Sequence, residues 1–200
     1  GVIGLELGSV YARLGTEVTV IEFLDAVTPG QDAEVAKVFG RMLKKQGLKI
    51  NTGAAVSKVE TLKTKSKVAY KLRKDDSVHE VDADVVLVAT GRLPYTEGLG
   101  LDTLGVQMSP RGQIKTDAQY RTNVAGVYAI GDVTNRVQLT PVAIREGMAF
   151  VETVFKGNPT AVANELIPSA VFTQPELGTG GLTVDQARDS EPVEIDCTSV

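Results

Sequence analysis

The first twenty-two residues, Gly1 to Glu22 (GVIGLELGSVYARLGTEVTVIE), decide the fold. Apolar side chains recur there at helical spacing, at Ile3, Leu7, Val10 and Leu14, which predicts a helix over residues 3–14. Gly15 is a helix stop, and residues 16–21 then alternate and are rich in β-branched side chains, which is typical of a strand. The chain therefore begins with a helix that opens on glycines and leads into a short strand.

Residues 32–51 repeat this order of helix and strand. Asp32 can cap a second helix, Gly47 would end it, and residues 48–51 would form a second short strand. The expected buried face of the second helix is its apolar side, which comprises Val35, Val38, Phe39, Met42 and Leu43. The order helix, strand, helix, strand indicates a parallel sheet with crossover helices.

Residues 54–89 have a different pattern. Three short alternating segments, at 55–60, 67–73 and 78–82, are separated by polar turns and predict a small antiparallel meander. Residues 84–89 (DVVLVA) are apolar on both faces, as is typical of a buried central strand in a parallel sheet.

A third region begins near residue 112. Residues 127–130 are expected to form a short strand that leads into Gly131 and Asp132. Thr140 and Pro141 are a helix-start signal, a capping hydroxyl followed by proline at the first helical position. That helix would run to Phe155, and residues 168–182 would form two strands joined by a glycine-rich turn.

The glycines and the acidic residue at the end of the first strand form a candidate dinucleotide site. Gly1 and Gly4 match the second half of the G-x-G-x-x-G fingerprint, whose first glycine and strand would precede residue 1. Glu22 follows Gly4 by eighteen residues, where the fingerprint has an acidic residue at about 20 residues' distance. Gly1 would let a pyrophosphate approach the backbone, Gly4 would let the helix pack close to the sheet, and the helix N-terminus would attract the phosphates.

Glu22 indicates which dinucleotide is bound. Its carboxylate can accept hydrogen bonds from both ribose hydroxyls of adenosine and would repel a 2′-phosphate, so the prediction is NAD rather than NADP. The alternative is that the glycines are ordinary packing residues and Glu22 a solvated strand end.

Composition argues against several other classes of function. The net charge of −4 and the pI near 5.1 provide no basic surface for nucleic acid or membrane phosphates. No apolar run is long enough to span a bilayer, and the first residues lack the pattern of a signal peptide. The single cysteine, Cys197, provides neither an internal disulfide nor a thiolate metal site, and the single histidine, His79, lies in a charged hairpin. We therefore expect no metal, no nucleic acid and no membrane as partners.

Longer stretches resemble the pyridine nucleotide-disulfide oxidoreductases. The resemblance rests on GVIGLELGSVYARLGTEVTVIEFLDAVTPGQDAEV from Gly1, KKQGLK from Lys44, VLVATGRLPYTEGLGLDTLGV from Val86 and VYAIGDVT from Val127. Up to about residue 65 the chain is most similar to dihydrolipoyl dehydrogenases, whereas residues 135–182 are most similar to glutathione reductases. Glu22 departs from the arginines usual in the latter, and Leu139-Thr140-Pro141 departs from the Leu-Ala-His usual in the former.

The resemblance implies roles for individual residues. NAD would be bound at the start of the first helix and at strand ends, by Gly1, Val2, Ile3, Gly4, Glu6, Glu22, Val56 and Gly91. Val56 would pack beside the adenine, Gly91 would let the cofactor pass close to its strand, and Glu6 would lie near the nicotinamide. FAD would be bound by Asp132 on its ribityl chain and, around the isoalloxazine ring, by Gln138, Leu139, Thr140 and Pro141. The helix that begins there would direct its partial positive charge at the flavin.

The fold expected from the sequence pattern and this resemblance is α/β, a Rossmann-like FAD/NAD(P)-binding fold in which a parallel sheet with crossover helices is joined to an antiparallel meander. Residues 1–93 would form an NAD-binding domain that lacks its first strand. Residues 94–166 would form a returning segment of an FAD-binding domain, and residues 167–200 the start of a C-terminal dimerisation domain.

The implied activity passes a hydride between NAD(H) and FAD, and electrons between the flavin and a C-x4-C cysteine pair, with a histidine from the partner subunit as acid-base group. None of these catalytic residues is present in the sequence. We therefore expect a fragment, inactive alone, of a homodimeric enzyme of the bacterial cytoplasm or mitochondrial matrix, of dihydrolipoyl dehydrogenase type, acting on a small-molecule or lipoyl-domain disulfide. The alternatives are an NADH-using glutathione reductase or related low-molecular-weight disulfide reductase, and a non-catalytic NAD-binding module.

Overall fold

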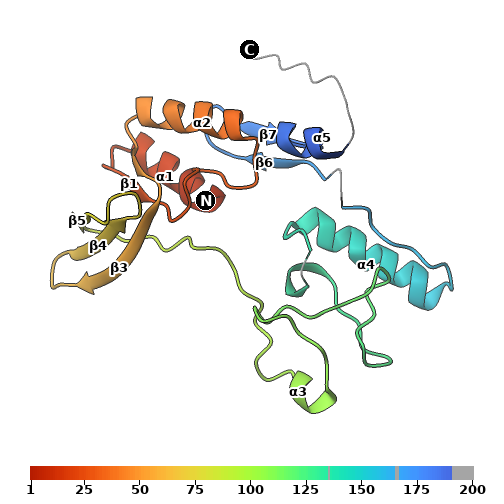
Figure 1. Cartoon of the computed structure of the whole chain (residues 1–200). Coiled ribbons are helices and arrows are strands. Elements are labelled where there is room, and N and C mark those ends of the chain that lie inside the picture. The colour runs from red at the N-terminus through yellow and green to blue at the C-terminus, as the bar shows by residue number, and fades with distance from the viewer. Residues whose placement is uncertain (135, 165–166, 191–200) are drawn as a thin grey trace. The chain divides into compact units, whose positions relative to one another are not determined.

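A computed structural model describes residues 1–134, 136–164 and 167–190, and it divides the chain into two compact units (Figure 1). Unit 1 comprises residues 1–90 and the described residues from Ile167 onward, and unit 2 comprises residues 91–166. The elements of unit 1 are α1 (Val2–Arg13), β1 (Thr19–Ile21), α2 (Ala33–Lys45), β2 (Lys49–Asn51), β3 (Ala54–Thr61), β4 (Ser66–Leu72), β5 (Val78–Ala83), β6 (Ser169–Val171), β7 (Leu177–Thr179) and α5 (Val184–Ser190). Those of unit 2 are α3 (Leu101–Leu104), the 3-10 helix η1 (Gly131–Val133) and α4 (Thr140–Phe155).

The core of unit 1 is built on a pair of parallel strands. β1 and β2 pair in register with Thr19 opposite Lys49, and α2 is the crossover helix between them. Buried apolar side chains from α1, α2, β2, β6 and two connecting segments meet there, namely Leu5, Val27, Phe39, Leu43, Leu48, Ile50 and Val171. The predicted alternation of helix and parallel strand is confirmed.

Helix α2 begins as predicted, and part of its predicted apolar face is buried: Phe39 and Leu43 lie in the core and Met42 packs against it. The carboxylate of Asp32 accepts hydrogen bonds from the N–H groups of Glu34 and Val35, so the predicted cap is confirmed. The buried residues are Ala36, Phe39, Gly40 and Leu43. The prediction that Val35 and Val38 are buried is wrong, because both are exposed. Two small residues, Ala36 and Gly40, face the core as well, and a Cβ on Gly40 would lie 3.5 Å from a methyl group of Val27.

Helix α1 is also confirmed, but its apolar stripe faces outward. Ile3, Leu7, Val10 and Leu14 are exposed, whereas Leu5, Gly8 and Ser9 are buried. A Cβ on Gly8 would lie 3.4 Å from a methyl group of Val18, which is an ordinary contact distance. The buried face of α1 includes the small residues Gly8 and Ser9.

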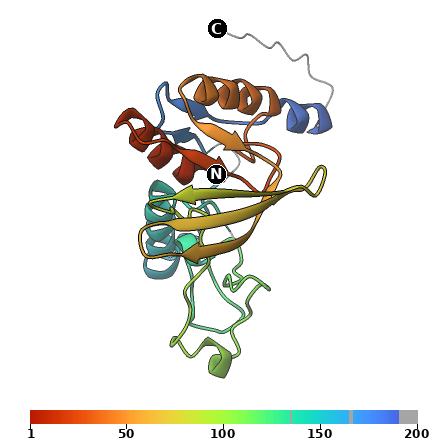
Figure 2. The same ribbon diagram turned by 90° about the vertical axis from the view of Figure 1, so that its left-hand side faces the viewer.

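The predicted meander is confirmed. β3, β4 and β5 form an antiparallel sheet in that order, and Figure 2 shows the three strands side by side. A register shift between Val56 and Lys58 interrupts the pairing of β3 with β4. The two predicted strands in residues 168–182 are also confirmed, as the antiparallel pair β6 and β7.

Residues 84–89 do not form the predicted buried strand. No strand of the described chain pairs with this segment, which Figure 1 draws as plain coil after β5. Val85 is 83% exposed and Val88 is 74% exposed. A strand forms only where a neighbour takes its N–H and C=O groups, and among the described residues none pairs with this segment.

Unit 2 has a small core of its own, made by Leu101, Val106, Ile114 and Ala129. Residues 127–130 are not the predicted strand, because their only ladder contact is a single bridge between Tyr128 and Arg121. Tyr120 has a φ of 67°, which ends the extended backbone on the partner side, and a ladder needs extended backbone on both sides.

Helix α4 ends at Phe155 as predicted, but its start differs in detail. Leu139 is the N-cap, and no side chain caps the helix. The prediction that the Thr140 hydroxyl caps α4 is therefore wrong, because Thr140 is already the first helical residue; Pro141 does lie in the first turn. Within the described ranges, no helix is both long and apolar enough to cross a membrane.

Candidate functional site

Glu22 follows β1 directly, and its carboxylate lies at the start of α1. Its Oε2 accepts a hydrogen bond from the amino group of Gly1 at 2.6 Å, and its Oε1 accepts one from the N–H of Leu24 at 2.9 Å. The side chain is 15% exposed. Burial raises the pKa of Glu22, but the hydrogen bonds from the nitrogen of Gly1 and the N–H of Leu24 lower it. Glu22 is therefore ionised at neutral pH.

The first turn of α1 provides the second half of this arrangement. The first intrahelical hydrogen bond runs from the N–H of Leu5 to the C=O of Gly1 at 3.2 Å. The N–H groups of Val2, Ile3 and Gly4 precede that bond and have no partner within the helix. No atom lies within 4 Å of a Cβ built on Gly1. An anion can be held here by backbone donors and the helix dipole.

The structure thus brings the predicted glycines and the predicted acid together. A dinucleotide fits this arrangement, because the helix start suits a pyrophosphate and the ionised carboxylate beside it suits a ribose diol. The role of Gly4 is less strict than predicted. Its Cβ would lie 3.4 Å from the Cβ of Ala89, which is an ordinary contact distance.

The other residues predicted to bind NAD lie in different surroundings. Val56 is 50% exposed at the bulge of β3, so its side chain is accessible to a ligand. Gly91 has a φ of 100° and falls in unit 2. The carboxylate of Glu6 accepts a hydrogen bond from the N–H of Phe172 at 2.8 Å, which ties α1 to the end of β6. The predicted roles of these three residues stay predictions.

The loop that carries Glu22 has supports that sequence analysis missed. The N–H of Gly53 donates to the C=O of Leu24 at 2.9 Å. Arg73 donates from Nη1 to the C=O of Phe23 at 2.9 Å, and its guanidinium lies 5.0 Å from the centre of the Phe23 ring. Arg73 gives no sequence signal among the other basic residues of the meander, whereas Gly53, next to a strand end, could have been found as a turn glycine.

The residues predicted to bind FAD lie in unit 2. Asp132 is exposed in η1, while Gln138, Thr140 and Pro141 are exposed around the first turn of α4 and Leu139 is half-buried. The turn before Asp132 is held against α4, because the N–H of Gly131 donates to Oε2 of Glu146 at 2.6 Å. Sequence analysis missed Glu146, because a glutamate in the middle of a helix is usually a surface residue.

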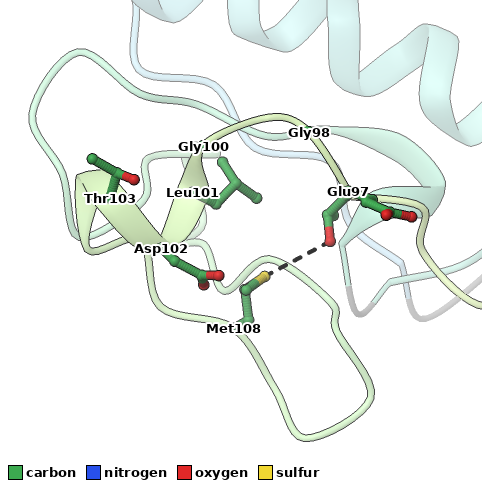
Figure 3. A pocket seen from close by; sticks show the side chains of 8 residues that line it. Glu97, Gly98, Gly100, Leu101, Asp102, Thr103 and Met108 are labelled. Carbon is green, nitrogen blue, oxygen red and sulfur yellow. Dashed lines mark hydrogen bonds between the residues drawn. The ribbon is translucent and has the colours of Figure 1, made fainter.

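A separate shallow pocket of about 540 Å³ lies in unit 2, around Glu97, Asp102 and Met108 (Figure 3). The hydroxyl of Thr96 points at the sulfur of Met108 across 4.0 Å. No predicted cofactor residue and no lysine or arginine lines this pocket, so it offers no cation to a phosphate. Among the described residues there is also no group of three or more histidine, cysteine, aspartate or glutamate side chains placed to hold a metal ion.

Comparison with known proteins gives the family. The family model described as pyridine nucleotide-disulphide oxidoreductase matches residues 1–147. The chain belongs to the pyridine nucleotide-disulphide oxidoreductase family. Its α/β Rossmann-like FAD/NAD-binding fold, predicted from the sequence, is confirmed by this match and by a solved structure of similar fold.

Relatives of this pyridine nucleotide-disulphide oxidoreductase chain are considerably longer. It is 41% identical to the mitochondrial dihydrolipoyl dehydrogenase of Schizosaccharomyces pombe, over 95% of this chain and 37% of that protein. It is 43% identical to a glutathione reductase of Burkholderia cepacia, over 94% of this chain and 41% of that protein. The Cu(II) complex of the HOCl-induced flavoprotein disulfide reductase RclA from Escherichia coli matches with a TM-score of 0.85 at 26% identity, over 96% of this chain and 43% of that one. The chain thus spans about two fifths of the relatives that it matches.

Proposed function

We propose that the chain acts as the NAD-binding part, together with some flavin contacts, of a longer FAD-dependent disulfide oxidoreductase of the dihydrolipoyl dehydrogenase type. The observation that carries the proposal is the largely buried carboxylate of Glu22, which lies at the start of α1 and accepts a hydrogen bond from the N–H of Leu24. A charge in this place favours a ribose diol and disfavours a 2′-phosphate, so the cofactor proposed is NAD rather than NADP.

In the proposed reaction, NAD when bound exchanges a hydride with the flavin. The residues of unit 1 bind and orient the dinucleotide: the N–H groups of Val2, Ile3 and Gly4 receive the pyrophosphate, and Glu22 accepts both ribose hydroxyls. The exposed side chain of Val56 is available to the adenine. Leu24 keeps one oxygen of Glu22 in place through its N–H.

In unit 2, Asp132 and the first turn of α4 are proposed to contact FAD. Asp132 is exposed and can accept a hydrogen bond from a ribityl hydroxyl. The first turn of α4 lacks any side-chain cap, so its N–H groups and partial positive charge remain available to stabilise negative charge on a reduced ring. The fit is favourable, because a capping side chain would occupy those donors.

The disulfide substrate and the assembly are proposals from the same resemblance. The likeness of the first 65 residues and the several dihydrolipoyl dehydrogenases among the relatives support a lipoyl-domain or small-molecule disulfide. We propose a homodimer in the bacterial cytoplasm or the mitochondrial matrix, in keeping with relatives that are bacterial or named mitochondrial.

The proposal is tested by reversing the charge at Glu22. Glu22→Arg removes the acceptor of the ribose hydroxyls, and hydrogen bonds to a charged group contribute about 1.5–3 kcal/mol each, so the Kd for NADH should rise by about ten-fold or more. The preference for NADH over NADPH should be lost. Binding is measured by nicotinamide fluorescence.

Glu17→Arg is the matched control, because Glu17 is an exposed glutamate just before β1 that pairs with Lys49. It makes the same change in net charge and should leave both affinities unchanged. An unchanged preference for NADH in Glu22→Arg would contradict the proposed role of Glu22.

A second candidate is a glutathione reductase that uses NADH. It is favoured by residues 135–182 and by the 43% identity to the Burkholderia cepacia enzyme. A coupled assay of the longer protein with lipoamide and with oxidised glutathione separates the two, since the turnover number should differ strongly between the two disulfides.

A further inference from the structure

Glu146 is the only charged side chain that is fully buried in the described part of the chain. It lies in the middle of α4, two turns from the flavin-facing start proposed above. A buried carboxylate is costly to desolvate and is retained in a fold only where partners compensate it. Its partners therefore indicate what it does.

The first partner is the turn that carries Asp132. Oε2 of Glu146 accepts the N–H of Gly131 at 2.6 Å, a short, charge-assisted hydrogen bond. The C=O of Gly131 accepts the hydroxyl of the buried Thr134 at 2.8 Å. Both polar groups of the residue before Asp132 are thus fixed, one by α4 and one within the turn.

Gly131 is itself required by this arrangement. It has a φ of 69°, and a Cβ built on it would lie 3.2 Å from the Cβ of Ala143 on α4. The turn and the helix are therefore in close contact, and Glu146 is the side chain that links them. The placement of Asp132 follows from the placement of Gly131, because η1 begins there.

The second partner is Arg136. Its Nη1 lies 3.5 Å from Oε1 of Glu146, its Nη2 donates to the C=O of Asp117 at 2.5 Å, and its guanidinium lies 4.7 Å from the centre of the Tyr120 ring. Oε1 of Glu146 has no hydrogen bond within the described residues, so Arg136 is the countercharge that compensates this oxygen. The carboxylate is thus held between the turn and a stacked arginine.

We propose that Glu146 is a positioning residue for flavin binding: it acts through Gly131 to hold Asp132 in place, and Arg136 lies beside its second oxygen as the countercharge. The inference rests on the proposed function, because it names how the proposed FAD contact is maintained. A side chain needed only for packing would not have to be charged, and an apolar residue of similar size would fill the same volume at lower cost.

The first measurement uses the 200-residue chain and needs no flavin. In Glu146→Gln, the amide of Gly131 keeps an acceptor of similar size but loses the charged one, and Arg136 faces a neutral amide. Hydrogen exchange at Gly131 should become at least several-fold faster. In the control Glu152→Gln, the carboxylate lost pairs with Lys156 on the surface of the same helix, and exchange at Gly131 should not change.

The second measurement uses the longer flavin-containing protein, freed of FAD and titrated with it. Glu146→Gln should raise the Kd for FAD by about ten-fold, and Asp132→Ala should do the same. If Glu146 acts through Asp132, the double variant should bind FAD no more weakly than Asp132→Ala alone. A merely structural role would instead give additive losses, with an equal fall in the Tm of the flavin-free and flavin-bound protein.

The outcomes separate the two claims. Suppose that the unsubstituted protein binds FAD. If Glu146→Gln binds FAD equally well, or if its loss of FAD affinity adds fully to that of Asp132→Ala in the double variant, the positioning role is wrong and the proposed function stands. If the unsubstituted protein binds no FAD, both fall. Should Glu146→Gln not fold, Arg136→Met removes the countercharge from the other side, and unchanged Gly131 exchange and FAD affinity in that variant contradict the proposal.

Discussion

Gly53 joins β2 to β3 beside the loop that carries Glu22, and its left-handed backbone favours glycine. Its φ is 60°, and a Cβ built on it would lie 2.8 Å from Oδ1 of Asp25. Its N–H and C=O bind Leu24 and Arg73, so a shift at Gly53 is passed to residues 22–25. We expect Gly53→Ala to destabilise unit 1 by about 1–2 kcal/mol from backbone strain alone and to weaken NADH binding several-fold by displacing Glu22.

Gly47→Ala is the matched control for this prediction. Gly47 also has a left-handed backbone, with a φ of 99°, but nothing lies within 4 Å of its Cβ position. It should lower the free energy of unfolding by a similar amount while leaving the Kd for NADH unchanged. Equal loss of NADH affinity in both variants would show that Gly53 acts through general stability and not through the Glu22 loop.

At the level of residues, sequence alone could identify Glu22 but not its supports. The spacing between Gly4 and Glu22 is local to one helix and one strand, so the pattern survives in the sequence. Gly53, Arg73 and Glu146 act through contacts with segments distant in the chain. Such contacts leave no periodic signal.

At the level of elements, Asp32 joins two helices. Its Oδ1 caps α2, and its Oδ2 accepts the N–H of Val184 at the start of α5 at 3.1 Å. These hydrogen bonds, that of Val184 foremost and that of Val35 next, lower the pKa of Asp32 against a smaller opposing effect of burial. The carboxylate therefore stabilises the fold more in its ionised form than in its protonated form.

The pH dependence of this capping follows from the sign of the shift. Because the pKa of Asp32 is lower in the folded chain, its stabilisation is fully present above the ordinary value of about 4 and is lost as the pH falls through the depressed folded value. We expect Asp32→Ala to lower the Tm by a few degrees at pH 7 and less at pH 3, as measured by circular dichroism. Asp32→Asn, which keeps an acceptor, should lose less at pH 7; a loss of Tm in Asp32→Ala that does not depend on pH would argue against the ionised cap.

The positions of most helices and strands could be predicted from the sequence, but which of their faces are buried could not. Periodicity predicts which side chains form an apolar face, yet the outward stripe of α1 and the exposed Val35 show that it does not decide which of those side chains are covered. Residues 84–89 carry a strong strand pattern and still remain unpaired, because strand formation depends on a neighbour as well as on sequence.

For the whole molecule, the division into two units predicts where each cofactor acts. The residues proposed to bind NAD lie, apart from Gly91, in unit 1, and those proposed to bind FAD lie in unit 2. NADH added to the 200-residue chain should therefore slow hydrogen exchange around residues 1–6, 22–24 and 53–56, and leave α4 unchanged. The variant Glu22→Arg should abolish the protection.

The same division predicts that the isolated chain is colourless. Its proposed flavin contacts amount to Asp132 and the first turn of α4, all exposed apart from the half-buried Leu139, whereas tight ligand sites bury about 70–90% of the ligand surface. The chain spans about two fifths of its flavoprotein relatives, such as 43% of the flavoprotein disulfide reductase from Escherichia coli. We expect purified chain to bind NADH weakly and to show no flavin absorbance after FAD is added and the excess removed. A flavin band near one equivalent per chain would mean that unit 2 alone encloses the cofactor, and the requirement for a longer protein would then be wrong.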